Sequence, residues 1–368
     1  MAFNPSDYSA LQSIRVRSHA TELPEEQERA AGELAGHARD GQLALFMGAG
    51  TGVPAGLPSW GDLLTWLAGR TGLPDGEGLE KLNPLDAAEI LRRQAAKRAG
   101  GDGRNALGDL VAERIGEPER YALSHILLAS LRTEQAITTN FDQLYETAVA
   151  AIEGERPPVV LPDSKRTELP TGQGSGGWLL KLHGDVGEPA SIVLDRRSFV
   201  RYDSTRRPLG GVLQTTLLTK HLLVVGASMT DDNVIRLVHE VSALHEEGGR
   251  TPRRLGTVLT LTRDPLRHRL WSPEFTYLEL GQDPDRVAEA GRELEIFLDR
   301  VALLATPTSS HLLDPRYREL LRSEERALAA DLEVLGARLD GFGGDRSAAP
   351  GWRQLAKALR AFGAPGAR

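Results

Sequence analysis

Five short, largely apolar runs recur along the chain, and helical periods separate them. The first run, Leu43–Met47, is apolar at every position, as expected of a strand that is buried on both faces of a parallel sheet. The later runs cover residues 136–138, 178–182, 221–225 and 257–261. Because strands alternate with helices, the pattern predicts an α/β fold: a Rossmann-like parallel sheet with helices on both faces.

Two stretches interrupt this alternation. Residues 62–133 show helical patterns and no convincing strand, which predicts a helical subdomain inserted between the first two strands. Residues 156–177 carry four prolines and four glycines without periodicity, which predicts a mobile loop or lid. The predicted domains are an N-terminal helical segment (1–42), a catalytic domain (43–283) and a charged helical extension (284–368).

Composition excludes several classes of site. The 368 residues contain no cysteine, which removes disulfides, thiol nucleophiles and zinc sites built on cysteine. A formal net charge of −7 gives no broad electrostatic footprint for nucleic acid. No apolar run approaches the roughly 18 residues that a membrane span requires. We therefore expect a cytoplasmic protein without membrane or direct nucleic-acid contacts.

The first candidate binding motif, residues 48–56, reads GAGTGVPAG and directly follows the first buried strand. Glycines in such a loop let backbone N–H groups approach a pyrophosphate closely, and the following helix terminus attracts the anion. The alternative is a tight turn between strand and helix, with Ser59 and Asp62 as a capping pair. Taken alone, the motif favours neither interpretation.

Three further polar motifs follow later strands. Residues 138–142 read TTNFD, residues 181–185 read KLHGD, and residues 226–231 read GASMTD. Each has a structural alternative: Asn140 with Gln143 is a good N-cap for a helix over 141–152, the histidine of KLHGD is an ordinary loop residue, and Asp231 caps the next helix. Open α/β sheets bind ligands at the carboxyl ends of their strands. We therefore interpret the four loops together as one nucleotide crevice.

The order of these motifs, GAG, T-x-N-x-D, HG and G-x-S between Gly48 and Asp231, resembles that of the sirtuin-like superfamily. Residues 56–60 (GLPSW), 138–142 and 192–195 (IVLD, followed by Phe199 and Tyr202) are typical of its prokaryotic NAD-hydrolase branch. The resemblance implies an NAD⁺ glycohydrolase that releases nicotinamide and ADP-ribose. It also implies a role in anti-phage defence by NAD depletion.

The chain also departs from the deacylase sirtuins. It lacks the four cysteines of their zinc ribbon, and Ser59-Trp60-Gly61 stands where they have Asp-Phe-Arg. Thr139 replaces their glutamine, and Gly52 replaces the serine of their glycine loop. These differences concern the acyl-lysine site and leave the dinucleotide site in place, so we expect NAD as substrate and no metal.

The catalytic hypothesis rests on Asn140 and His183. Nicotinamide leaves a cationic ring as a neutral molecule, so this cleavage needs no general acid, unlike ordinary glycoside hydrolysis. The amide of Asn140 holds the attacking water and a ribose hydroxyl, and His183 acts as the base. By resemblance, Asp142 accepts a hydrogen bond from the nicotinamide carboxamide. The predicted NAD-binding residues are Gly48, Ala49, Gly50, Thr51, Asp142, Gly226, Ser228 and Asp231.

Two other functions stay open at this point. One is a zinc-free sirtuin-type deacylase or ADP-ribosyl transferase, which needs an acyl-peptide or protein acceptor. The other is a non-catalytic scaffold that binds NAD or ADP-ribose without turnover. The family resemblance further implies a homo-oligomer and a separate activating partner, such as a HerA-type hexameric ATPase.

Overall fold

The computed structural model describes residues 23–73, 78–99, 104–116, 118, 120–161, 177–247, 254–281, 286–306, 312–341 and 350–362. The chain forms two compact units, Met1–Leu303 and Leu304–Arg368. The first unit is built on a seven-stranded sheet in the order β3-β4-β2-β1-β5-β6-β7, with every neighbouring pair parallel. This arrangement confirms the predicted Rossmann-like α/β fold.

The strands follow the apolar runs closely. They are β1 (Leu43–Met47), β2 (Gln135–Thr138), β3 (Val159–Val160), β4 (Trp178–Lys181), β5 (His221–Val225), β6 (Gly256–Thr260) and β7 (Phe275–Glu279). The sequence pattern missed β3 and β7. The prediction of a loop over 156–177 is therefore wrong at residues 159–160, which pair with Leu179 and Leu180 at the sheet edge. Residues 162–176 lie outside the described residues.

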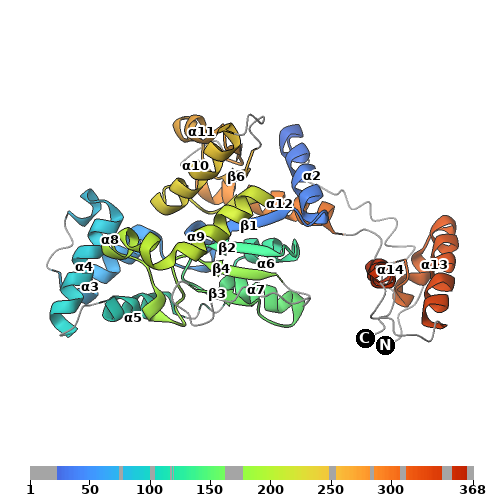
Figure 1. Ribbon diagram of the computed structural model, residues 1–368, viewed down its shortest axis with the longest axis horizontal. Helices are drawn as coiled ribbons and strands as arrows, with labels where there is room; N and C mark the ends of the chain where they lie inside the picture. The colour runs from blue at the N-terminus through green and yellow to red at the C-terminus, as the bar shows by residue number, and fades with distance from the viewer. Residues whose placement is uncertain are drawn as a thin grey trace. The chain divides into compact units, whose positions relative to one another are not determined.

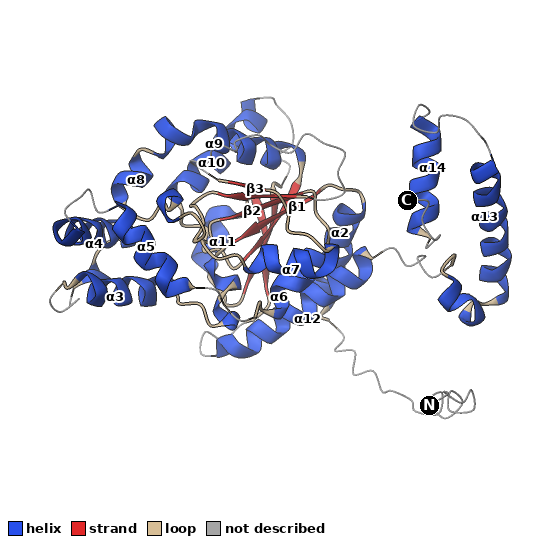
Figure 2. Cartoon of the chain, turned by 90° about the horizontal axis from the view of Figure 1, so that it is seen from below, coloured by secondary structure: helices blue, strands red, loops and turns tan. Residues whose placement is uncertain are grey.

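Helices cover both faces of the sheet (Figure 2). One layer is formed by α9 (Tyr202–Thr219) and α10 (Asp232–Glu247). The other is formed by α6 (Leu123–Ser130), α7 (Leu144–Glu153) and α12 (Val287–Ala305). The strands between these layers are almost wholly buried, as their continuous apolar sequences require. Helix α2 (Glu25–Arg39) precedes β1, and α11 (Pro265–Trp271) joins β6 to β7.

A group of helices with its own core lies at one end of the first unit (Figure 1). It contains α3 (Trp60–Thr71), α4 (Pro84–Ala99), α5 (Arg104–Ile115) and the short α8 (Arg196–Val200). Its core joins Leu67, Leu91 and Val111 to Phe141 and Leu194. Phe141 belongs to the loop after β2, so this helical core packs directly against a candidate site loop.

The second unit is small and helical. It contains a 3₁₀ segment (Pro315–Leu320), α13 (Ser323–Gly341) and α14 (Pro350–Ala361). Its buried residues are Leu312, Leu313, Leu321, Ala329 and Leu359. Nearly all of α12 belongs to the first compact unit, which ends at Leu303, and the predicted domain boundaries at residues 43 and 284 stay a prediction.

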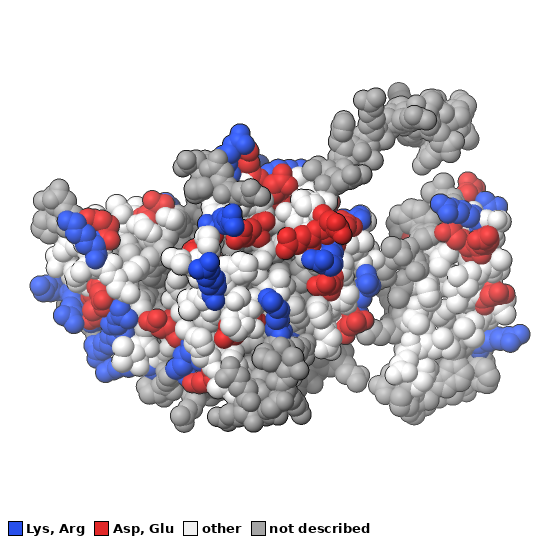
Figure 3. Space-filling view, turned by 90° about the horizontal axis from the view of Figure 1, so that it is seen from above, with Lys and Arg blue, Asp and Glu red and all other residues white. Residues whose placement is uncertain are grey.

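The surface shows no large single-sign patch on the face seen in Figure 3, where basic and acidic side chains are interspersed. Among the described helices, none is both long enough and apolar enough to cross a membrane.

Candidate active site

The four candidate loops leave the sheet at one level. Met47 of β1 pairs with Thr138 of β2 and with Val225 of β5, and Thr138 pairs in turn with Lys181 of β4. These four residues form one row across the sheet, and each candidate motif starts at or directly after its member of the row. Parallel register therefore brings the motifs, which are up to 183 residues apart in sequence between Gly48 and Asp231, to the same edge.

Asn140 and His183, the predicted catalytic pair, follow neighbouring strands. Each lies two residues beyond the paired positions Thr138 and Lys181. Adjacent strands stand about 4.8 Å apart, so the two residues leave the sheet side by side. Both are buried, with 8% and 7% of their surface exposed. The structure thus brings the predicted pair to the same edge of the sheet.

Hydrogen bonds set the orientation of the Asn140 amide. Its Nδ2 donates to Thr51 Oγ1 at 3.1 Å, and Thr51 Oγ1 donates to the carbonyl of Gly48 at 2.9 Å. Since the Thr51 proton is used on Gly48, Thr51 accepts from the amide, which places Oδ1 on the opposite side. Oδ1 is buried and has no hydrogen-bond partner among the described residues. This oxygen is therefore available to accept a hydrogen bond from a ligand or from a water molecule.

The predicted capping role of Asn140 is wrong. Helix α7 starts at Leu144, with Gln143 at its N-cap, and not at residue 141. Asp142 accepts instead from the Leu144 backbone N–H at 3.0 Å, while the Asn140 backbone N–H donates to Thr138 Oγ1 at 3.0 Å. The backbone of Asn140 therefore takes part in the turn after β2, while its side chain does not cap the helix.

His183 is held by a carboxylate from a different loop. Its Nε2 lies 2.8 Å from Asp231 Oδ2, and its ring packs edge-on against Phe199 with 5.1 Å between centroids. Asp231 Oδ1 also accepts from the backbone N–H groups of Asn233 and Val234, so its predicted role as a helix cap is confirmed. In a neutral imidazole, a proton on Nε2 leaves Nδ1 as the acceptor.

The charge of Asp231 is maintained despite its burial. Desolvation by burial acts to raise the pKa of this carboxyl, but the neighbouring His183 and the backbone donors of Val234 and Asn233 outweigh it, so the pKa lies below its ordinary value. An ionised Asp231 orients the ring of His183 through the contact with Nε2.

The glycines of the first and fourth motifs allow two loops to touch. A Cβ on Gly48 would lie 2.6 Å from Ala227 Cα, and a Cβ on Gly226, whose φ is +68°, would lie 2.6 Å from the Thr51 backbone nitrogen. The backbone N–H of Gly50 donates to the Gly226 carbonyl at 2.9 Å. Close contact between the β1 and β5 loops is thus one reason for glycine at these positions.

The remaining residues of these two motifs have local roles. Ser59 Oγ accepts from the Asp62 backbone N–H at 3.2 Å, so the capping pair predicted at the start of α3 is confirmed. Ser228 is exposed, and its Oγ lies 2.7 Å from Thr230 Oγ1. Contacts of residues 48–51 with pyrophosphate stay a prediction, as do the NAD contacts of Asp142, Gly226, Ser228 and Asp231.

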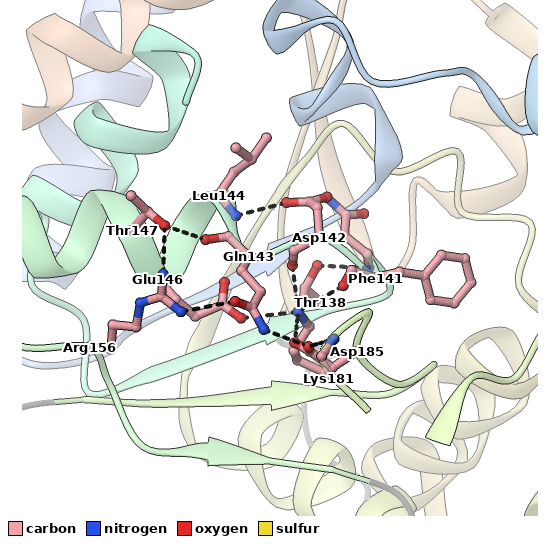
Figure 4. Close-up of polar contacts among 12 residues, drawn as sticks. Thr138, Phe141, Asp142, Gln143, Leu144, Glu146, Thr147, Arg156, Lys181 and Asp185 are labelled. Carbon is pink, nitrogen blue, oxygen red and sulfur yellow. Dashed lines mark hydrogen bonds and ion pairs between the residues drawn. The ribbon is translucent and has the colours of Figure 1, made fainter. Parts of the chain in front are cut away.

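Sequence reasoning missed the role of Lys181. Its side chain is fully buried, and its Nζ donates to Glu146 Oε1 at 3.0 Å and to the carbonyls of Phe141 and Asp142 at 3.2 and 2.5 Å (Figure 4). Nζ also forms an ion pair with Asp185. The available signal was a lysine in the otherwise apolar run 178–182, because a lysine is almost never fully buried unless it is paired.

Lys181 holds the loops after β2 and β4 together. Burial acts to lower its pKa, but the carboxylates of Glu146 and Asp185 outweigh that effect and raise the pKa above its ordinary value. Gln143 Nε2 adds a bond to Asp185 Oδ1 at 2.7 Å. The cation thus anchors the backbone next to Asn140 and the loop that carries His183, which makes Lys181 a positioning residue.

A family model described as "SIR2-like domain" matches residues 134–276. This range runs from β2 to β7 and contains the loops of Asn140, His183 and Asp231. Residues 134–276 are therefore similar to a SIR2-like domain, and the resemblance to the sirtuin-like superfamily is confirmed. The loop of Gly48 lies outside the matched range but hydrogen-bonds to the β5 loop inside it.

Three relatives carry the name NAD(+) hydrolase ThsA. Those of Enterococcus faecium, Bacillus cereus (strain MSX-D12) and Acinetobacter baumannii (strain 532279) are 30%, 27% and 26% identical to this chain over 212, 207 and 214 residues. The alignments cover 57%, 56% and 57% of this chain and 42%, 41% and 41% of the relatives. The chain thus spans about two fifths of the length of these curated relatives.

Proposed function

We propose that this protein is an NAD⁺ glycohydrolase that cleaves the bond between nicotinamide and ribose. The observation that carries the proposal is the buried Oδ1 of Asn140, which lacks a partner among the described residues and lies at the same sheet edge as His183. The relatives' printed activity, NAD(+) hydrolase, agrees with this reading.

Asn140 positions the reactants. With Nδ2 bonded to Thr51, its free carbonyl oxygen accepts a hydrogen bond from a ribose hydroxyl or from the attacking water. An amide held on one side by a buried hydroxyl keeps its acceptor at one angle, and such positioning accounts for much of the advantage of an enzyme over solution. Nicotinamide leaves as a neutral molecule with the electron pair of the broken C–N bond.

His183 takes the proton. As water adds its oxygen to the ribose C1′, its proton passes to Nδ1, and the resulting imidazolium is stabilised by the Asp231 carboxylate on Nε2. The arrangement of base and orienting carboxylate follows the general logic of catalytic triads, without their nucleophile. The products are nicotinamide and ADP-ribose, and the proton returns to solvent.

The loops after β1 and β5 are placed to bind the rest of the dinucleotide. Residues 48–51 directly follow β1 and are assigned to the pyrophosphate, and Gly226 and Ser228 follow the neighbouring β5 and are assigned to the adenosine half. Asp142 follows Asn140 by two residues and is assigned to the nicotinamide carboxamide. These contacts are part of the proposal.

The experiment is incubation of the purified protein with NAD, followed by chromatography of nicotinamide and ADP-ribose. We expect both products with water alone, and a loss of at least roughly 10²-fold in rate for Asn140→Ala and for His183→Ala. Circular dichroism of each variant controls for folding. Cleavage at the parental rate in both folded variants contradicts the assignment.

The same assay separates the alternatives. Nicotinamide release that requires an added acyl peptide or protein acceptor indicates a deacylase or an ADP-ribosyl transferase. Thermal stabilisation by NAD without any product indicates a binding scaffold. Neither alternative uses the water-only reaction expected here.

The biological part of the proposal rests on the family resemblance. NAD depletion by this enzyme in the cytoplasm serves defence against phage, and the protein acts as a homo-oligomer under a separate activator such as a HerA-type ATPase. Measurement of cellular NAD after infection, with and without the gene of the partner, tests this part.

A further inference from the structure

A cavity of about 740 Å³ lies between α5, α7 and the loop after β4. The residues that argue for a ligand are Arg120, Tyr121, Gln143, Leu144, Thr147 and Arg156. Neither Asn140, His183 nor Asp231 lines it. The volume falls in the range of small-molecule sites, roughly 300–1,000 Å³. The cavity is therefore large enough for a ligand of its own, separate from the catalytic pair.

Two basic side chains stand among the described residues that line this cavity. Arg120 and Arg156 line it, and no acidic side chain stands among its described lining residues. The Arg156 guanidinium donates only to neutral acceptors among the described residues, Gln143 Oε1 at 2.9 Å and Thr147 Oγ1 at 3.5 Å. Two guanidinium groups with no carboxylate among the described lining residues favour an anion, and their planar fork suits phosphate oxygens.

The rest of the lining suits a flat apolar group. Leu144 is buried, and Tyr121 and Val186 are half-buried. One aromatic and two aliphatic side chains therefore line the same cavity. Gln143 also lines the cavity, and its Nε2 donates to Asp185 Oδ1 (Figure 4). Aromatic and apolar walls with few convergent polar groups are the usual composition of a ligand pocket.

We propose that this cavity is a second ligand site, which binds a phosphorylated nucleoside or a similar molecule that joins phosphate to a planar ring. Arg120 and Arg156 bind the phosphate, and Tyr121 and Leu144 contact the ring. Gln143 links the cavity through Asp185 to the Lys181 cluster, by which we mean Lys181, Glu146 and Asp185. The bound molecule therefore lies close to the loop of the catalytic asparagine. The proposal of this second site does not depend on whether the protein cleaves NAD.

The test is photo-crosslinking with 8-azido-ADP, with the labelled peptides identified by mass spectrometry. This design distinguishes the cavity from the catalytic crevice, which also offers a place for ADP. We expect label on peptides that carry Tyr121 or Thr147, and we expect excess ADP, but not adenosine, to remove it. The Arg120→Gln/Arg156→Gln variant should lose this label by roughly tenfold or more, because each charge-assisted contact contributes about that factor.

The matched control is Arg29→Gln, an exposed arginine on α2 outside the cavity lining, which should keep the parental labelling. Circular dichroism and thermal unfolding check that the double variant folds. The proposal is overturned if label appears only on the loops 48–51 and 226–228. It is also overturned if the folded double variant labels Tyr121 and Thr147 peptides at the parental level.

Discussion

His183 Nε2 lies 2.8 Å from Asp231 Oδ2, although the strands that precede these residues are not neighbours in the sheet. His183 follows β4 and Asp231 follows β5, and β2 and β1 stand between them. The pair therefore closes across the ends of the two strands that carry Asn140 and the glycine loop. It joins the base of the proposed reaction to the loop after β5.

Asp231→Asn separates the two roles of this residue. Asparagine is as good an N-cap as aspartate, so α10 keeps its cap, but His183 loses its anionic partner. We expect NAD cleavage to fall by roughly 10²-fold or more, because the imidazolium is no longer stabilised and the ring tautomer is no longer set. The free energy of unfolding should change by no more than about 1 kcal/mol.

The control for that variant is Asp264→Asn, since Asp264 caps α11 through the Arg267 backbone N–H at 3.0 Å and has no histidine partner in the site. Its NAD cleavage should equal that of the parent. Equal rates for Asp231→Asn and Asp264→Asn would mean that the carboxylate of Asp231 does not support catalysis.

Lys181→Met should strongly destabilise the protein. It leaves Glu146 and Asp185 buried without their cation, and breaking such a pair costs roughly 3–5 kcal/mol. Arg286→Met is the matched control, because Arg286 pairs with Glu289 at 3.1 Å, both side chains are exposed, and loss of the pair should cost about 1 kcal/mol or less. Urea unfolding measures both variants. Similar midpoints for the two would contradict the proposal that Lys181 holds the loops after β2 and β4 together.

The apolar runs were sufficient to predict the sheet, because strands buried on both faces must be apolar at nearly every position. They predicted β1 and β5 to the residue, but not β3, whose two residues Val159 and Val160 carry too little pattern, nor the edge strand β7. The helix start at Leu144 was also missed, because the side chain of Asp142 binds that backbone N–H in place of Asn140.

The four motifs lie at one edge of the sheet, but the contacts between their side chains could be found only in the fold. Nothing local in the sequence relates His183 to Asp231, which are 48 positions apart, or Asn140 to Thr51, which are 89 apart. Register across β1, β2, β4 and β5 creates both contacts. The Lys181 cluster escaped notice for the same reason, since its partners lie on α7 and on two loops.

Gly48→Ala should abolish NAD cleavage and should have a smaller effect on the free energy of unfolding. The added Cβ meets Ala227 Cα at 2.6 Å, so the β1 and β5 loops must separate and the hydroxyl of Thr51 moves away from Asn140. Gly211→Ala is the control, because that glycine lies in α9 with nothing within 4 Å, and alanine there should stabilise the helix by up to about 1 kcal/mol. Steady-state rates that are equal in both variants would contradict this role.

The acid stability of the helical core depends on Glu89. Hydrogen bonds from Arg92, and then from Arg93, lower the pKa of Glu89 from 4.5 to about 2. A carboxyl whose pKa is lowered by folding stabilises the folded state when the pH is above the pKa of the unfolded chain. This stabilisation is lost as the pH falls from 4.5 towards 2. Glu89→Gln should therefore cost on the order of 1–3 kcal/mol at pH 7, and less below pH 4.5.

Unfolding midpoints of the parent and the variant from about pH 2 to about pH 7 test this prediction, because this range covers the interval between the two pKa values of Glu89. Glu113→Gln is the control, because its ion pair with Arg70 is half exposed and contributes little. A difference between parent and Glu89→Gln that stays constant over the whole range would show that the carboxylate does not titrate as described.

The most direct test of the central claim is a crystal structure of His183→Ala with NAD bound, since this variant should bind the dinucleotide without cleaving it. We expect the nicotinamide ribose beside Asn140, with a ribose hydroxyl donating to Oδ1 at roughly 2.6–3.2 Å and the pyrophosphate at residues 48–51. NAD bound elsewhere, with Asn140 Oδ1 still unpaired, would contradict the claim that this side chain and His183 serve one ribose.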